Sequence, residues 1–478
     1  MFEHTYARLG EDFAADARPT PVAAPRLLAW NDALASSLGL PDAWRDEAAQ
    51  LFSGNAWPEG ARPVALAYAG HQFGHFVPRL GDGRAIALGE WLAPDGRRVD
   101  LQLKGSGPTA FSRRGDGRAA IGPVLREFLL SEAMHALGVP TTRALAAVAT
   151  GEVVVRDEIL PGAVLTRVAA SHVRVGTFQY FAARGEDANV RRLADHVIAR
   201  HYPGVQGAPD RYLALLEAVS QAQAALVAAW MHAGFIHGVM NTDNVAVSGE
   251  TLDYGPCAFL DEYHPAKVFS SIDRHGRYAY GNQPPIAQWN LARLAECLLP
   301  LFQRQGEEGV ADARAVIEGF AGHYRSAWLD GLRRKLGLAT AHEDDEALGR
   351  EFLAALEAVA ADYTLSFRAL ADALGGEPAG LPRTPAMDAW RARWQARLAA
   401  EGRAPDDVRA GLRAANPAVI PRNHLVEAAL AAAAAGELQS FEMMLAAVRR
   451  PFDDGPAQQP YMAPPGAGQR VTQTFCGT

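Results

Sequence analysis

The sequence predicts an α+β protein of two lobes, with additional helical segments toward its N- and C-terminal ends. Short apolar runs bounded by Gly, Pro and Asp turns fill residues 61–175 and are typical of an antiparallel sheet. Helical periodicity dominates residues 176–450. The 478 residues are also more than one compact core usually organises, so more than one lobe is expected.

The first lobe is predicted to follow an irregular leader. Residues 1–60 mix short helical patterns with proline breaks, and they are expected to pack on the fold. Strands are predicted at the apolar runs 85–88, 99–103, 153–155 and 163–168. A single helix is predicted at residues 123–137, because Pro123 suits a first turn and Gly138 suits a stop.

The second lobe is predicted to be mainly helical. Apolar residues from Leu213 to Trp230 recur on one face of a long helix, which Gly234 is expected to end. An irregular stretch rich in Gly, Asn and Asp follows at residues 237–261. The final stretch, residues 451–478, is Pro/Gly-rich in its first part and is predicted to be a flexible tail.

Composition argues against several broad classes of protein. The net charge is −8 and the sequence pI is near 6.0, whereas nucleic-acid-binding domains are usually basic. The N-terminus lacks the basic and apolar regions of a secretory signal, and no run reaches the roughly 18 apolar residues of a membrane helix. Three cysteines do not make a disulfide framework. We therefore expect a cytoplasmic protein with no nucleic-acid or membrane partner and an unknown oligomeric state.

A glycine loop and a lysine strand are the first candidates for a nucleotide site. Gly81 and Gly83 let backbone N–H groups approach an anion, and Arg84 adds positive charge, although such a string is often only a hairpin turn. Lys104 ends an apolar strand about twenty residues later, as the phosphate-binding lysine of kinases does. Glu127 of the single helix is its expected carboxylate partner, and the alternative is a solvated glutamate.

Arginines gather at two further places. The string FSRRGDGR, residues 111–118, sets three arginines around two glycines and suits a polyphosphate, or else forms a charged solvated loop. Arg167 and Arg174 follow on the strand where a kinase would hold adenine. Two guanidinium groups suit phosphates better than a neutral base, so the phosphates are predicted to occupy this pocket. The alternative is an arginine that pairs with a carboxylate.

The most specific signal is the string HGVMNTDN at residues 237–244, followed by DYG at 253–255. Protein kinases carry H-R-D-x-x-x-x-N and then D-F-G, where the Asn and the second Asp bind Mg²⁺. Asn244 and Asp253 fit those two roles, which predicts a protein-kinase-like arrangement of the two lobes. The position of the kinase base is Val239, which cannot accept a proton, and the nearest carboxylate is Asp243.

These strings resemble the SelO family, also called YdiU, whose members are protein adenylyltransferases once classed as pseudokinases. The resemblance lies in the strings AGHQFGHF (69–76), QLKGSGPT (102–109), SRRGDG (112–117), HGVMNTDN (237–244) and DYGP (253–256). Segments at residues 281–284 and 416–423 also match, so the resemblance spans nearly the whole chain.

The resemblance implies an inverted ATP, whose γ-phosphate is buried and whose α-phosphate faces the acceptor. It implies Asp243 as the base, and Asn244 and Asp253 as ligands of Mg²⁺ or Mn²⁺. The nucleotide contacts that it implies are Gly81, Gly83, Arg84, Lys104, Asp116, Gly117, Arg167, Arg174 and Asp253.

The reaction expected from this resemblance moves AMP from ATP to Ser, Thr or Tyr hydroxyls of protein substrates and releases pyrophosphate. One alternative is a protein kinase that transfers the γ-phosphate. The other is a non-catalytic nucleotide-binding module, which Val239 favours and the retained pair Asn244 and Asp253 disfavours.

The last cysteine poses a separate question. Eukaryotic members of the family carry a selenocysteine at the third position from the end, which is Cys476 here. Cys476 is either an unreactive surface thiol or a redox handle. Cys257, close after the DYG string, is a possible disulfide partner if the two α-carbons can approach within about 7 Å.

Overall fold

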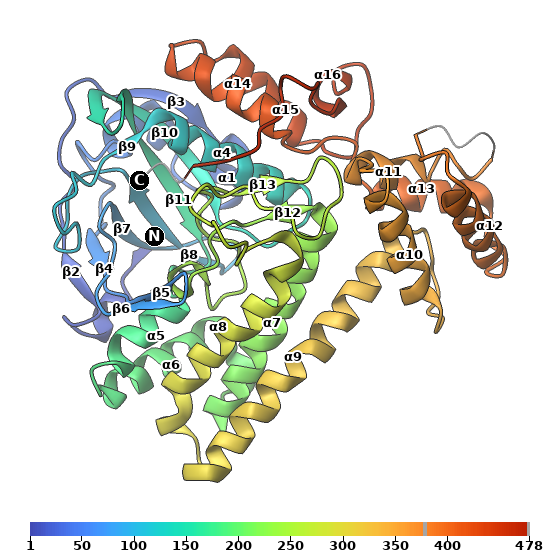
Figure 1. The fold of residues 1–478 in the computed structure, drawn as a ribbon. Helices are drawn as coiled ribbons and strands as arrows, with labels where there is room; N and C mark the ends of the chain where they lie inside the picture. The colour runs from blue at the N-terminus through green and yellow to red at the C-terminus, as the bar shows by residue number, and fades with distance from the viewer. Residues whose placement is uncertain (376–379, 476–478) are drawn as a thin grey trace.

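A computed structural model describes residues 1–375 and 380–475. It confirms the α+β class: an antiparallel sheet forms one lobe and helices form the other, with a further group of helices from the C-terminal part of the chain (Figure 1). The predicted strands and the predicted helix of the first lobe are all present. Their bounds differ by a few residues, except that the strand predicted at 153–155 begins ten residues earlier, at Arg143.

The sheet of the first lobe has nine strands in the described residues, with the path β2-β4-β7-β8-β11-β10-β3. The strands are β1 (Phe2–Glu3), β2 (Ala14–Asp16), β3 (Arg26–Trp30), β4 (Val64–Leu66), β7 (Ala85–Leu92), β8 (Arg98–Lys104), β9 (Ala119–Ala120), β10 (Arg143–Val155) and β11 (Ile159–Ala169). In the register of β8 and β11, Gln102 lies opposite Arg167 and Lys104 lies opposite Leu165. Because side chains alternate along a strand, Gln102, Lys104 and Arg167 share one face of the sheet.

Helix α4 (Ile121–Ala136) packs on the sheet and is buried nearly all round. Its outer side is covered by α14 (Asn423–Ala434) and α15 (Gln439–Val448), so the C-terminal part of the chain returns to the first lobe (Figure 1). Arg126 of α4 is 2.9 Å from Glu427 of α14.

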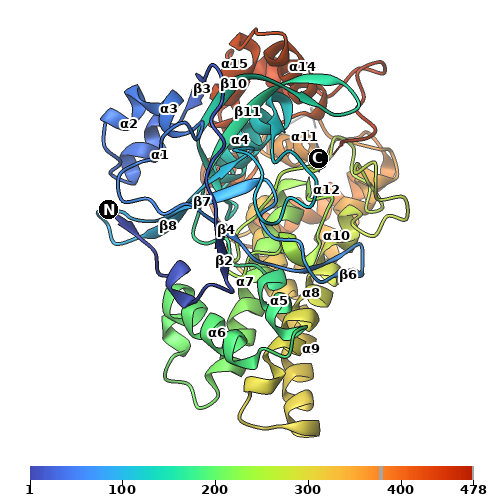
Figure 2. The ribbon, with the colours of Figure 1, turned by 90° about the vertical axis from the view of Figure 1, so that its left-hand side faces the viewer.

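The leader does more than cover the fold, because it supplies three strands of the sheet. Its helices α1 (Asp32–Ser37), α2 (Ala43–Asp46) and α3 (Ala48–Leu51) pack on the face of the sheet away from α4 (Figure 2). Their apolar side chains join Leu101, Leu103 and Val164 in a second hydrophobic core. The sheet is therefore covered on both faces.

The helical lobe is organised around α7 (Arg211–Ala233), which packs on α8 (Gln283–Leu298) and α9 (Gly306–Lys335). Asp210 caps the start of α7, and Gly234 ends it in the left-handed conformation as predicted. By length and composition α7 could cross a membrane, but 56% of its most apolar window is buried inside the protein, as in a core helix. Helices α5 (Val175–Ala182) and α6 (Asp187–His201) complete the lobe beside it.

Short elements connect these parts. Two hairpins are formed by β5 (Gly70–Gln72) with β6 (His75–Val77), and by β12 (Phe235–Ile236) with β13 (Ala258–Phe259). The 3-10 helices are η1 (Ala7–Leu9), η2 (Pro203–Val205), η3 (Thr242–Asn244), η4 (Tyr280–Asn282) and η5 (Leu299–Leu301).

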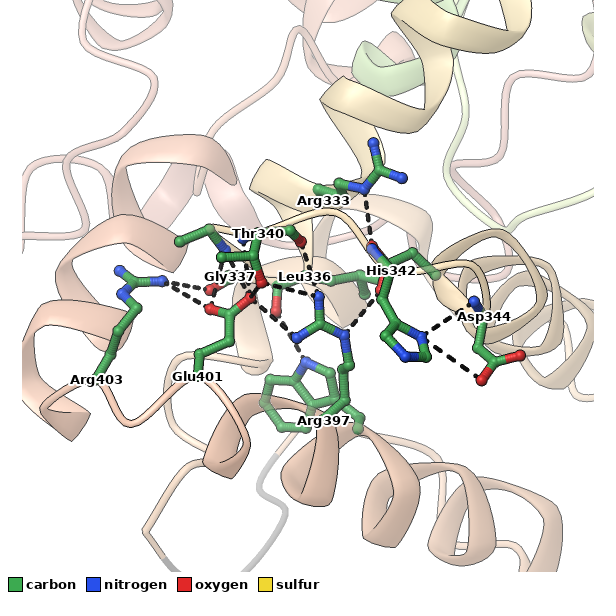
Figure 3. Close-up of polar contacts among 12 residues, drawn as sticks. Arg333, Leu336, Gly337, Thr340, His342, Asp344, Arg397, Glu401 and Arg403 are labelled. Atoms are coloured by element: carbon green, nitrogen blue, oxygen red, sulfur yellow. Dashed lines mark hydrogen bonds and ion pairs between the residues drawn. The ribbon is translucent and has the colours of Figure 1, made fainter.

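The C-terminal extension continues with α10 (Asp345–Glu357), α11 (Tyr363–Ala369), α12 (Pro385–Ala399) and α13 (Pro405–Ala415). Polar contacts join it to the end of α9 (Figure 3). Arg397 of α12 donates to Asp345 at 2.9 Å and to Glu401 at 3.0 Å. Arg403 donates to the carbonyl of Gly337 at 2.8 Å. These bonds give α12 a defined position relative to α9.

The tail is not free along its whole length. It contains α16 (Gln459–Met462), and Thr474 is buried against the segment after the DYG string. The Thr474 amide donates to Phe269 at 2.7 Å, and its hydroxyl donates to Pro256 at 2.5 Å. Cys476 lies outside the described residues. Cys257 is fully buried, and burial raises the pKa of its thiol to about 12.

Candidate active site

A cleft of about 750 Å³ lies between the sheet and the helical lobe. It is lined by all the residues predicted for the site except Glu127, which lies directly behind Lys104. The predicted residues in its lining are Gly81, Gly83, Arg84, Lys104, Asp116, Gly117, Arg167, Arg174, Asp243, Asn244 and Asp253. Segments up to 170 residues apart in the sequence therefore meet at one place.

Four charged side chains form an ion cluster on the sheet side of the cleft. Lys104 donates to Glu127 at 2.6 Å and to Asp253 at 2.8 Å, which confirms the predicted lysine–glutamate pair. Arg167 donates to Glu127 as well, and to Asp253 at 3.0 Å. Arg167 thus has the carboxylate partners that the alternative described, and its contact with the nucleotide stays a prediction. We call Lys104, Glu127, Arg167 and Asp253 the paired wall.

Electrostatics keep both carboxylates of the paired wall ionised. Burial alone would raise the pKa of Glu127, but Arg167 and Lys104 outweigh it and hold that pKa below its ordinary value. The same two cations hold the pKa of Asp253 well below its ordinary range despite burial. Asp253 also has φ +69°, a left-handed conformation that costs a non-glycine residue about 1–2 kcal/mol. The two ion pairs offset that strain and direct its carboxylate into the cleft.

The glycine loops are shaped by packing. Gly81 has φ +71°, and a Cβ there would lie 2.2 Å from the Phe111 ring. Gly117 has φ +64°, and a Cβ there would lie 2.1 Å from Gly107. Both positions therefore require glycine simply to bring residues 80–84 against residues 105–118, before any ligand is considered.

Asp116 lies at the rim of the cleft. Its carboxylate accepts hydrogen bonds from Arg156 at 2.8 and 3.0 Å, and from the Arg118 amide at 3.0 Å. Hydrogen bonds from Arg156 lower its pKa. A nucleotide contact by Asp116 would have to coexist with this exposed ion pair.

Arg174 differs from Arg167. It precedes α5, donates from Nε to the carbonyl of His172 at 3.1 Å, and stacks over the Tyr68 ring at 4.2 Å. Its Nη2 is buried without a hydrogen-bond partner among the described residues. No carboxylate forms an ion pair with it in that part of the chain. Burying a guanidinium edge without an acceptor is costly, so Arg174 is a candidate for binding an anion.

The loop at residues 237–244, which we call the catalytic loop, forms the other side of the cleft. Asp243 lies in η3 and is 8% exposed; its Oδ1 is buried without a partner in the described residues, and Gln72 Nε2 is 3.5 Å from Oδ2. Burial raises the pKa of Asp243 to about 6. Val239 carries no acidic or basic group, but its carbonyl accepts a hydrogen bond from the side-chain Nδ2 of Asn244 at 3.1 Å.

The β5–β6 hairpin holds this loop and was missed as a functional element. The His71 amide donates to Thr242 Oγ1 at 2.6 Å, and the Phe73 amide donates to Asn241 Oδ1 at 3.0 Å. A Cβ on Gly70 would lie 2.5 Å from Asp243 Oδ1. The string AGHQFGHF was a signal for this hairpin, but nothing local in it shows that it docks on residues more than 160 positions away.

The arrangement suits a hard divalent cation only in part. Asn244 uses its amide nitrogen on Val239, so its oxygen is left for a ligand, and Asp253 adds a carboxylate. Among the described residues no group of three or more His, Cys, Asp or Glu side chains could hold a metal. Two protein oxygens fit Mg²⁺ or Mn²⁺ if nucleotide phosphates and water complete the coordination, which is usual for Mg²⁺.

Known proteins are similar to this chain over its whole length. A family model described as "Protein adenylyltransferase SelO" matches residues 1–449. "Protein nucleotidyltransferase YdiU" of Bradyrhizobium sp. (strain ORS 278) is 56% identical over 485 residues, which cover 100% of this chain and 99% of the relative. The proteins of the same name from Rhodopseudomonas palustris (strain BisB5) and Rhizobium etli (strain CIAT 652) are 57% and 56% identical, covering 100% of this chain and 99% and 97% of the relatives.

Proposed function

The chain belongs to the SelO family of protein adenylyltransferases, and we propose on this premise that Asp243 activates a hydroxyl side chain of an acceptor protein for attack on ATP. It is a nucleotidyltransferase whose nucleotide substrate is ATP. The observation that carries the residue assignment is the buried Asp243 oxygen, which lies beside Asn244 and has no hydrogen-bond partner in the part of the chain that the structure describes. The position that a kinase gives to its base is an apolar Val239.

The proposed chemistry uses Asp243 at the acceptor and cations at the leaving group. Asp243 accepts the proton of the Ser, Thr or Tyr hydroxyl, and the hydroxyl oxygen forms a bond to the α-phosphorus. The bond from the α-phosphorus to the oxygen that bridges to the β-phosphate breaks, and pyrophosphate leaves. A positioned base of this kind contributes about 10²–10⁴-fold to a rate.

The orientation of ATP follows from where the unsatisfied cation lies. Arg174 Nη2 lacks an acceptor, and Lys104 lies in the same cleft lining. We assign the β- and γ-phosphates to the space between Arg174 and Lys104, with the α-phosphate toward Asp243 and adenine toward the outer part of the cleft. Gly81, Gly83, Arg84, Asp116 and Gly117 would line the nucleotide's path.

Two groups support the proposed centre without touching the acceptor. Glu127 holds Lys104 and Arg167 in place. Asn244 and Asp253 would hold Mg²⁺ or Mn²⁺, which would neutralise phosphate charge when bound.

Location in the cytoplasm is proposed because Cys257 and Cys297 are free thiols in the described residues.

ATP labelled separately at the α- and γ-phosphates tests the proposal. The intact chain, Mg²⁺ and a panel of candidate acceptor proteins should give label on protein from the α position, with pyrophosphate released. Mass spectrometry should find AMP on Ser, Thr or Tyr. Protein label from the γ position, or AMP on another residue type, would contradict the proposal.

A further inference from the structure

A group of basic side chains lies beside the catalytic loop but outside the nucleotide cleft. We call Arg274, His275 and Arg277 the basic loop. The next residue, Tyr278, donates from its hydroxyl to Asn241 at 2.7 Å, two positions before Asp243. The same Asn241 oxygen accepts from the Phe73 amide of the β5–β6 turn. The basic loop is thereby held close to the proposed base.

The basic loop has a defined shape. Asp273 is buried at 6% exposure and accepts the amides of Arg277 at 2.9 Å and Tyr278 at 2.8 Å. Its carboxylate is therefore used to cap the turn and forms no ion pair with the basic loop. Gly74 of the hairpin packs over Arg277, since a Cβ there would lie 3.7 Å from the guanidinium carbon.

The side chains of the basic loop are not paired with carboxylates. Within the described residues, none of Arg274, His275 and Arg277 forms an ion pair, and Arg277 Nε is buried without a hydrogen-bond partner. The Arg277 guanidinium stacks on the Trp289 ring of α8 at 4.8 Å. Arg293 stacks on the same ring at 5.1 Å, but it already pairs with Glu296 at 2.6 Å. Arg277 is thus a guanidinium that stacks on a ring and forms no ion pair with any described residue.

ATP is not the natural anion for Arg277. The cations that line the nucleotide cleft include Lys104 and Arg174, whereas Arg277 does not line it. The cleft lining does include Phe73 and Asn241, which contact Tyr278 next to the basic loop, and Ile272, which precedes Asp273 and is 54% exposed. The basic loop therefore borders the opening through which an acceptor side chain would reach Asp243.

We propose that the basic loop selects acceptors in which acidic residues flank the modified hydroxyl, with Arg277 pairing with one of their carboxylates. The inference rests on the proposed function, because it assumes a protein hydroxyl as acceptor. Arginine suits this role because its planar fork binds a carboxylate through two hydrogen bonds. Its stacking on Trp289 reduces the side-chain freedom that binding would otherwise remove.

Peptide acceptors of matched sequence test the proposal. Ser-, Thr- and Tyr-centred peptides carry Glu, Gln or Lys at the flanking positions, and transfer of α-labelled AMP by the intact chain is measured. We expect kcat/KM to be about tenfold higher for Glu-flanked than for Gln-flanked peptides, as for one favourable charge pair. The ratio should fall as NaCl increases from about 50 to 500 mM, since salt screens exposed charges.

Substitutions at Arg277 separate a specificity role from a structural one. Arg277→Ala should bring the Glu/Gln ratio to about one, and Arg277→Lys should keep part of it. Arg277→Glu should reverse the preference in favour of Lys-flanked peptides, a gain that a damaged fold cannot produce. Arg191→Ala is the matched control, because Arg191 also stacks on an aromatic ring, Tyr212, at 5.4 Å. It should leave the ratio at the wild-type value.

Two outcomes would overturn the inference. In the first, the wild-type chain transfers AMP without regard to flanking charge. In the second, Arg277→Ala lowers transfer to all peptides equally, as a purely structural stacking residue would. Failure of the proposed function is different, because no α-label would then reach a hydroxyl of any peptide or protein acceptor.

Discussion

The two sides of the cleft differ in how their charged groups are paired. On the paired wall, Lys104 and Arg167 share Glu127 and Asp253. On the opposite side, which we call the open wall, Asp243 Oδ1 and Arg174 Nη2 are buried without partners in the described chain.

This difference teaches where substrate groups belong. A buried polar atom without a partner costs about 1–3 kcal/mol, so a fold tolerates it where a ligand supplies the partner. The charged groups of the paired wall already have partners within the chain. In the proposed function the acceptor hydroxyl would supply the partner for Asp243, and phosphate would supply the partner for Arg174. Each wall can be tested by removing one member.

The largest effect is expected at Asp243. Asp243→Ala should lower AMP transfer by about 10²–10⁴-fold, because the base is lost, while the dissociation constant for ATP stays within about twofold. Initial rates with α-labelled ATP and calorimetric titration measure the two quantities. Val239→Ala is the control and should transfer AMP normally. Near-normal turnover by Asp243→Ala would remove the distinction between the walls.

The second prediction breaks the paired wall. Asp253→Ala leaves Lys104 and Arg167 sharing only Glu127, and loss of one partner from buried ion pairs costs about 3–5 kcal/mol. We expect a lower melting temperature and loss of the part of ATP binding that depends on Mg²⁺. Asp32→Ala removes an exposed ion pair to Arg45 and should change stability by less than about 1 kcal/mol. Equal effects of the two substitutions would count against a positioning role for the wall.

Lys335, a buried lysine that does not line the cleft, gives a further test of how burial affects a charged side chain. Lys335 is 5% exposed and lies over the Phe367 ring at 4.2 Å, and burial lowers its pKa from 10.5 to about 7. Between these values the unfolded chain binds more protons than the folded chain, so the Lys335 contribution makes the free energy of unfolding rise with pH.

Lys335→Met should therefore lose that rise and gain stability at pH 7, by an amount on the order of 2–4 kcal/mol, since one pKa unit is about 1.4 kcal/mol. Urea unfolding at pH 7 and pH 10 measures the effect. Lys267→Met, a second lysine over an aromatic ring, is the control and should keep the wild-type pH dependence. If Lys335→Met parallels the wild type, Lys335 is not penalised by burial.

Much of the site was predictable from local patterns. The string at residues 237–244 and the DYG string predicted Asp243, Asn244 and Asp253, because metal and base roles require fixed residue types at fixed spacing. Its position at the end of an apolar strand placed Lys104, and the single helix placed Glu127. The lysine–glutamate pair was predictable because both partners belong to elements that the sequence alone identifies, and the structure confirms it.

Other features could not be predicted because they depend on contacts between distant segments. The register of β8 against β11 sets Arg167 beside Lys104, and this brings Arg167 to Glu127 and Asp253. The docking of the β5–β6 hairpin on η3 has the same origin. No local pattern indicated that α14 and α15 return to cover α4. Helix periodicity predicts that such helices exist but not which surface they cover.

The orientation of ATP is tested most directly by comparing two ligands on one variant. Calorimetric titration of Arg174→Ala with ATP and with adenosine measures how much of the loss depends on phosphate. If Arg174 binds the phosphates, ATP affinity should fall about 10–100-fold, as for a lost charge-assisted hydrogen bond, and adenosine affinity should stay within about twofold. Equal losses for ATP and adenosine would contradict this orientation of ATP and place adenine, not phosphate, at the open wall.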